Sequence, residues 1–124
     1  MQKIINTLQI LSLAIFLSFV YGCSSSAPGE VAEKFLTTVA KKDFAGAKQY
    51  TTKETGALLD MMAGLSAQMG AKMKAKKDFK FIMEGEEING DDAVVSYREK
   101  DGGNIKKIKL KKVKGDWKIH EKKR

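Results

Sequence analysis

The stretch IKKIKLKKVKGDWKI, residues 105–119, decides the fold. Within it, Ile108 and Leu110 alternate with charged neighbours, which is the period of a strand that buries one face. The segment 114–116 (Lys-Gly-Asp) has turn chemistry, and the strand after it carries two apolar side chains on one side, Trp117 and Ile119. The stretch therefore predicts two antiparallel strands with a row of lysines on the outer face: Lys107, Lys109 and Lys111.

Two more strands are expected before this stretch. The segment 79–83 has strand spacing, with three apolar side chains on one face, Phe79, Phe81 and Met83. The segment 93–99 has two on one face, Val95 and Tyr97. Turn residues follow at 88–92 and at 101–104, so the second half of the chain predicts an antiparallel meander of about four strands.

Helical spacing characterises the segment that precedes the sheet. Pro28 stands where it can open a helix that runs to about Lys41, and Asp43 can cap a short helix over 44–50. Thr51-x-x-Glu54 fits a capping box for a third helix over 52–76. We expect this third helix to bend or break at its glycines, and to pack on the core through Leu58, Met62, Leu65, Met69 and Met73.

The fold class that follows is α+β, with N-terminal helices packed on a curved antiparallel sheet of about four strands. The apolar faces of both layers predict the core. Its expected members are Phe35, Leu58, Met62, Leu65, Met69, Phe81, Val95, Tyr97, Leu110, Trp117 and Ile119.

The first 22 residues have the features of a targeting segment. Lys3 gives a positive start, and the apolar core from Ile10 to Val20 has about 11 residues, too few to span a bilayer. Val20-Tyr21-Gly22-Cys23 resembles the bacterial lipobox, which predicts cleavage between Gly22 and Cys23 and acylation of the cysteine thiol. We therefore expect a signal peptide over 1–22, a lipidated cysteine and flexible tether over 23–29, and one domain over 30–124.

Cysteine usage limits the chemistry of the chain, and the positive charge either favours anionic partners or simply keeps the protein soluble. Cys23 is the only cysteine, so the chain can form no internal disulfide and no cysteine zinc site. The precursor carries a formal charge of +8, and loss of the leader with Lys3 leaves 22 basic against 15 acidic residues, or +7. The expected location is the bacterial cell envelope. Ser24 weakly favours the outer membrane if two membranes are present, because it is not the aspartate associated with inner-membrane retention.

Three short segments carry a family resemblance. The chain resembles the nuclear-transport-factor-2-like superfamily in three places: the helix with Phe35-Leu36, the joint 42–47 (KDFAGA) and the closing strand 113–119 (VKGDWKI). Within it, the chain is similar to small bacterial lipoproteins of the domain of unknown function 4878 family, over about 29–120. The resemblance implies a curved sheet wrapped around helices with a conical pocket between them. The superfamily hosts enzymes, binding modules and dimerisation domains, so the fold implies no activity.

The residues that could carry catalysis do not form a recognisable set. His120, the only histidine, is expected to point to solvent, because alternation from Trp117 and Ile119 turns it away from the core. Isomerases and dehydratases of the resembled superfamily use an Asp base, or an Asp–His pair, with a Tyr donor. The residues of these types in this chain are Asp43, Tyr50, Asp60 and Tyr97. Their spacing matches no known catalytic set, so we expect no enzyme, no cofactor and no metal.

Two further features leave alternatives open. Methionine thioethers can bind copper, but the helical spacing of these methionines favours packing in the core. The alternative is that they line a pocket for an apolar ligand, formed by Met62, Met69, Met73 and Tyr97. The lysine row on residues 107–111 suits an anionic lipid or envelope polymer, or else only protects an exposed sheet from aggregation. Nucleic acid does not fit an exported protein without an aromatic-rich stacking segment.

The sequence therefore predicts a membrane-anchored envelope lipoprotein that is a non-enzymatic binding or interaction module, with a protein partner unknown. The alternative is a protein with a pocket for a small apolar or lipidic ligand. A pocket isomerase or dehydratase is the third hypothesis.

Overall fold

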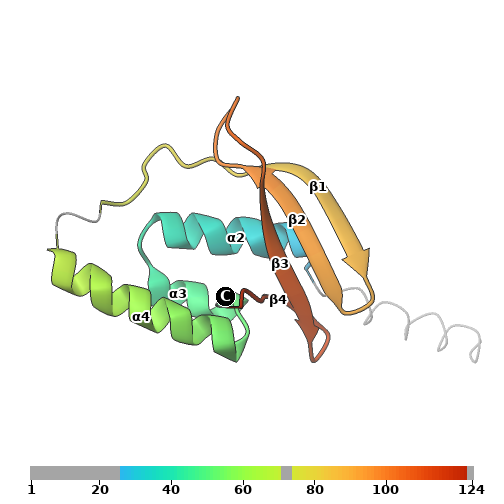
Figure 1. Ribbon diagram of the computed structural model, residues 1–124, viewed down its shortest axis with the longest axis horizontal. Coiled ribbons are helices and arrows are strands. Elements are labelled where there is room, and N and C mark those ends of the chain that lie inside the picture. Colours follow the sequence, from blue (N-terminus) through green and yellow to red (C-terminus); the bar gives the residue numbers. More distant parts are fainter. Residues whose placement is uncertain (1–25, 71–73, 123–124) are drawn as a thin grey trace, which may run out of the picture.

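The computed structural model describes residues 26–70 and 74–122 of the chain. Helices come first along the chain and a four-stranded sheet follows (Figure 1), which confirms the coarse α+β prediction. The elements are α2 (Pro28–Ala40), α3 (Phe44–Ala47), the 3-10 helix η2 (Lys48–Tyr50), α4 (Lys53–Met69), β1 (Ile82–Asn89), β2 (Asp92–Arg98), β3 (Lys106–Val113) and β4 (Asp116–Ile119).

The sheet is an antiparallel meander in the order β1-β2-β3-β4. Two tight turns connect its outer pairs, at the places where the sequence predicts them. Between β1 and β2, Gly90 has a φ of 59°; between β3 and β4, Lys114 and Gly115 have φ values of 51° and 86°. Two successive positive φ values are the turn geometry whose twist matches that of the flanking strands, so the turn sets the β3–β4 register.

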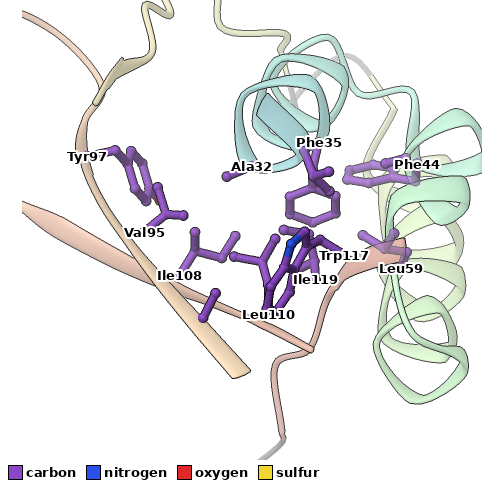
Figure 2. Packing of buried hydrophobic residues seen from close by; sticks show 13 residues of the cluster. Ala32, Phe35, Phe44, Leu59, Val95, Tyr97, Ile108, Leu110, Trp117 and Ile119 are labelled. Atoms are coloured by element: carbon purple, nitrogen blue, oxygen red, sulfur yellow. The ribbon is translucent and has the colours of Figure 1, made fainter. Parts of the chain in front are cut away.

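The hydrophobic core lies between the helices and the inner face of the sheet (Figure 2). Val95, Leu110 and Ile119 are almost completely buried, and six of the predicted core residues are buried: Phe35, Val95, Tyr97, Leu110, Trp117 and Ile119. The whole buried cluster is Val31, Ala32, Phe35, Phe44, Ala47, Leu59, Ala93, Val95, Tyr97, Ile108, Leu110, Trp117 and Ile119.

α2 and α3 begin as the sequence predicts. Pro28 occupies the first turn of α2, where its missing amide hydrogen leaves no helical bond unmade. The amide of Gly29 donates to Glu86 Oε1 of β1 over 2.9 Å, and a Cβ at this position would collide with the sulfur of Met83. The Asp43 side chain accepts from the Gly46 amide at 2.9 Å and caps α3.

α4 differs from its prediction in length, cap and orientation. Thr52 caps the helix, whereas the sequence predicts Thr51. The helix does not break at its first two glycines, Gly56 and Gly64. It ends before Gly70, whose φ is 54°, instead of at Lys76. The buried residues of α4 are Thr55, Gly56 and Leu59.

The predicted core positions on α4 were therefore wrong. Met62, Leu65 and Met69 are 38%, 50% and 50% exposed, and Leu58 is half-buried. The physical reason is that α4 packs mainly on α3 and η2, not across the sheet, so a different side of the helix faces the core. Met73 lies outside the described residues.

The first strand lies further along the chain than predicted. β1 starts at Ile82 and reaches Asn89, with an irregularity in its pairing between Met83 and Gly85. Phe81 precedes the strand and stacks on Tyr97, with ring centroids 5.6 Å apart. The Glu-rich second half of β1 has weak strand propensity, and its pairing with β2 overrides that local preference.

Candidate functional site

The outer face of β3 carries three exposed lysines in one row. Lys107, Lys109 and Lys111 alternate with Ile108 and Leu110, which are buried on the inner face. On β2, the residues paired with the first two lysines are uncharged (Ser96 opposite Lys107, Val94 opposite Lys109), whereas Asp92 pairs with Lys111. We name these three lysines the basic row.

The neighbouring lysines of β3 already have partners. Lys106 Nζ lies 2.9 Å from a carboxylate oxygen of Glu99, and Lys112 Nζ lies 5.4 Å from the ring centroid of Trp117. By contrast, no lysine of the basic row forms an ion pair within the described part of the chain. Among the lysines of β3, those that remain available for an external anion are therefore the three on the outer face of the sheet.

An open pocket of about 550 Å³ adjoins the basic row. It lies where the start of α4 meets the end of β4, and Lys111 belongs both to its wall and to the basic row. The other lining residues are Glu54, Leu58, His120, Glu121 and Lys122. Apolar Leu58 thus lies beside two lysines and two glutamates, whose formal charges balance.

Glu54 and Glu121 limit the positive charge of this pocket. A hydrogen bond from its own backbone amide lowers the pKa of Glu54, with smaller contributions from the Thr52 hydroxyl and from His120 and Lys111. The carboxylate of Glu121 accepts from the backbone amide of Lys109 at 3.1 Å. The Glu121 carboxylate is therefore held in place by a backbone hydrogen bond.

His120 does not point freely to solvent, so that prediction was wrong. Its side chain is half-buried, and its Nδ1 lies 2.9 Å from Oγ1 of Thr52, the cap of α4. β4 ends at Ile119, so strand alternation no longer fixes the direction of the next side chain. Sequence reasoning missed this contact because the two residues are 68 positions apart.

The residues named as catalytic analogues each have a structural partner. Asp43 caps α3, and Asp60 pairs with Lys48 at 2.9 Å on the surface. Tyr50 packs against the edge of the core. Tyr97 is buried beside Phe81, where burial, followed by the charge of Glu99, raises the pKa of its hydroxyl.

The expected pocket lining is not assembled. Met62 and Met69 are exposed on α4, whereas Tyr97 is 6% exposed within the core. Among residues 26–70 and 74–122, no group of three or more His, Cys, Asp or Glu side chains is arranged to hold a metal ion.

The predicted cleavage and acylation site, Gly22 and Cys23, lies outside the described residues. In the part of the chain that the structure covers, no helix combines the length and apolar character needed to cross a membrane. Comparisons with protein-family models, with curated proteins and with solved structures each find no match.

Proposed function

We propose that this protein is a lipid-anchored lipoprotein of the bacterial envelope, a non-enzymatic module that holds its basic row against anionic lipid. In this proposal Cys23 carries the acyl chains, and the domain keeps the nuclear-transport-factor-2-like arrangement of helices on a curved sheet. The observation that supports it is the basic row itself, three exposed lysines on one face without ion pairs in the described chain.

The anchor and the basic row would act together. Acyl chains keep the domain at the bilayer surface, where each lysine near an anionic leaflet adds about 1 kcal/mol at low salt. The chain enters α2 at Pro28, only five residues after Cys23, so the tether reaches at most about 18 Å. The domain therefore stays within reach of headgroups, and its charged face decides how it rests on them.

The test is vesicle co-sedimentation of the unlipidated chain 24–124, which keeps every described element. The vesicles contain phosphatidylcholine with or without phosphatidylglycerol, at low and high salt. We expect binding that needs the anionic lipid and weakens with salt. Replacing Lys107, Lys109 and Lys111 by Gln should lower the affinity at low salt by about a hundredfold, at about 1 kcal/mol per lysine.

A matched control separates position from total charge. Lys34, Lys41 and Lys80 are exposed lysines away from β3, and their replacement by Gln removes the same charge. The control should bind nearly as well as the unmodified chain. Equal losses in the two triple variants, or binding that ignores salt and anionic lipid, would remove the basic row from the proposal. Salt-sensitive binding to an acidic envelope polymer alone would reassign its partner.

A further inference from the structure

α4 exposes a line of large apolar side chains. Met62, Leu65 and Met69 are 38%, 50% and 50% exposed and follow one another at helical spacing, in line with half-buried Leu58. We name Leu58, Met62, Leu65 and Met69 the α4 stripe. At a rise of about 1.5 Å per residue it is about 16 Å long. A continuous apolar line on a surface helix marks an interaction surface.

Basic groups lie at both ends of the α4 stripe. At its start, Leu58 shares the open pocket with Lys111 and Lys122, and also with Glu54 and Glu121. Further along the chain, the exposed segment 74–77 carries Lys74 and Lys77, together with Lys76, which pairs with Glu99 at 3.2 Å. An apolar line with lysines near both of its ends matches the order of a bilayer surface, where acyl chains accept the apolar side chains and phosphates attract the lysines.

We infer that the α4 stripe is a bilayer-contact surface, which lies parallel to an anionic phospholipid membrane at the boundary of headgroups and acyl chains. The inference rests on the proposed membrane location and adds the surface that enters the lipid. Lys111 links the two surfaces, because it belongs to the basic row and lines the pocket with Leu58. α4 and the β3–β4 turn lie along the same side of the molecule (Figure 1).

Charge favours a bilayer over a second copy of this chain. Each copy of this chain carries a formal net charge of +8, or +7 without the leader, so two copies repel each other when their α4 stripes are laid together. An anionic bilayer instead neutralises that charge. Methionine also fits this partner, because its flexible, unbranched side chain adapts to the irregular surface that acyl chains present.

The test places a tryptophan on the stripe. The variant Leu65→Trp of chain 24–124 is mixed with phosphatidylglycerol vesicles that contain brominated acyl chains, which quench tryptophan fluorescence on contact. Ala67→Trp is the matched control, because Ala67 is also exposed but lies on the opposite side of α4. The natural Trp117 is 7% exposed and gives a background from the unmodified chain.

We expect the quenched fraction of the fluorescence to be several times larger for Leu65→Trp than for Ala67→Trp. A second pair introduces charge: Leu65→Glu should weaken vesicle binding about tenfold, and Ala67→Glu less than about twofold. Circular dichroism checks that all four variants remain folded.

Equal quenching of the two tryptophan variants on vesicles that bind both would overturn the inference. So would a concentration-dependent dimer in sedimentation that Leu65→Glu abolishes while no quenching occurs, since the stripe would then pair with a second copy. Absence of vesicle binding overturns it too. The acylation state of Cys23 is measured separately, so failure of the stripe and failure of the anchor are distinguishable.

Discussion

Thr52 connects the start of α4 to the end of β4 through side chain and backbone together. Its Oγ1 accepts from the Thr55 amide and lies 2.9 Å from His120 Nδ1, while its amide donates to the carbonyl of Ile119 at 2.9 Å. Thr55 adds a second connection, because its hydroxyl bonds both the carbonyl and the amide of Glu121. These bonds fix the pocket wall on which His120 lies.

Thr52→Ala should therefore lower the free energy of unfolding by about 1–3 kcal/mol, because it removes a helix cap and leaves the His120 ring without its partner. Thr52→Ser keeps the hydroxyl and should recover most of that loss. Urea denaturation monitored by circular dichroism measures both. If the alanine and serine variants were equally stable, the hydroxyl would not have the role assigned to it.

Glu99 provides a pH-dependent contribution to stability. Its hydrogen bond from Lys106, supported by Lys76 at 3.2 Å, lowers the pKa of this carboxyl below the ordinary value of 4.5. A carboxyl with a lower pKa in the folded state stabilises the fold above the unfolded pKa, and the contribution disappears as the pH falls through the folded pKa.

Glu99→Gln should accordingly lower the free energy of unfolding at pH 7, by less than about 1 kcal/mol because the pair is largely solvated. The difference from the unmodified chain should shrink at pH 3, because this pH lies below the ordinary pKa of 4.5 and the contribution is lost as the pH falls further. Urea titrations at the two pH values measure it. A difference that is the same at both would assign the effect to packing instead of charge.

At the scale of the element, α4 has one side on the core and another open to solvent. Leu59 is 4% exposed and belongs to the buried cluster, whereas Met62, three residues later, is 38% exposed. Leu59→Ala should lower the free energy of unfolding by about 2–5 kcal/mol, and Met62→Ala by less than about 1 kcal/mol. Chemical denaturation of both variants tests the orientation, and the reverse order would contradict it.

The strands were predictable from sequence where one face is buried. In β2, β3 and β4 the alternation of Tyr97, Ile108 or Trp117 with polar neighbours indicates directly which face meets the core. β1 was misplaced because it is an edge strand with no fully buried position, so its sequence carries little of that signal.

The orientation of α4 could not be predicted in the same way. Its apolar residues spread over a wide arc of the helix, from Leu59 to Leu65, and the part of that arc that faces the core depends on where α3 and η2 lie. The contact of Thr52 with His120 depends on the same packing. The basic row was predictable as an exposed face, but its pocket was not, because that pocket combines residues from α4 and the end of β4.

At the scale of the whole molecule, the helices cover one face of the sheet and leave the lysines of β3 on the other. Burial of apolar side chains between the two layers holds the fold, and little of the excess positive charge is used within it. The basic row, the pocket and the α4 stripe meet around Lys111 and Leu58. The partner that we propose for this surface is an anionic bilayer, and the proposal requires an exported and anchored chain.

The anchor is therefore the central claim, and mass spectrometry of the protein extracted from the cell envelope tests it most directly. We predict a mature chain that begins at Cys23 and whose first peptide carries diacylglycerol on the thiol, while Cys23→Ala accumulates with residues 1–22 attached. An envelope protein that retains its leader, or a released chain with an unmodified Cys23 thiol, would contradict the account.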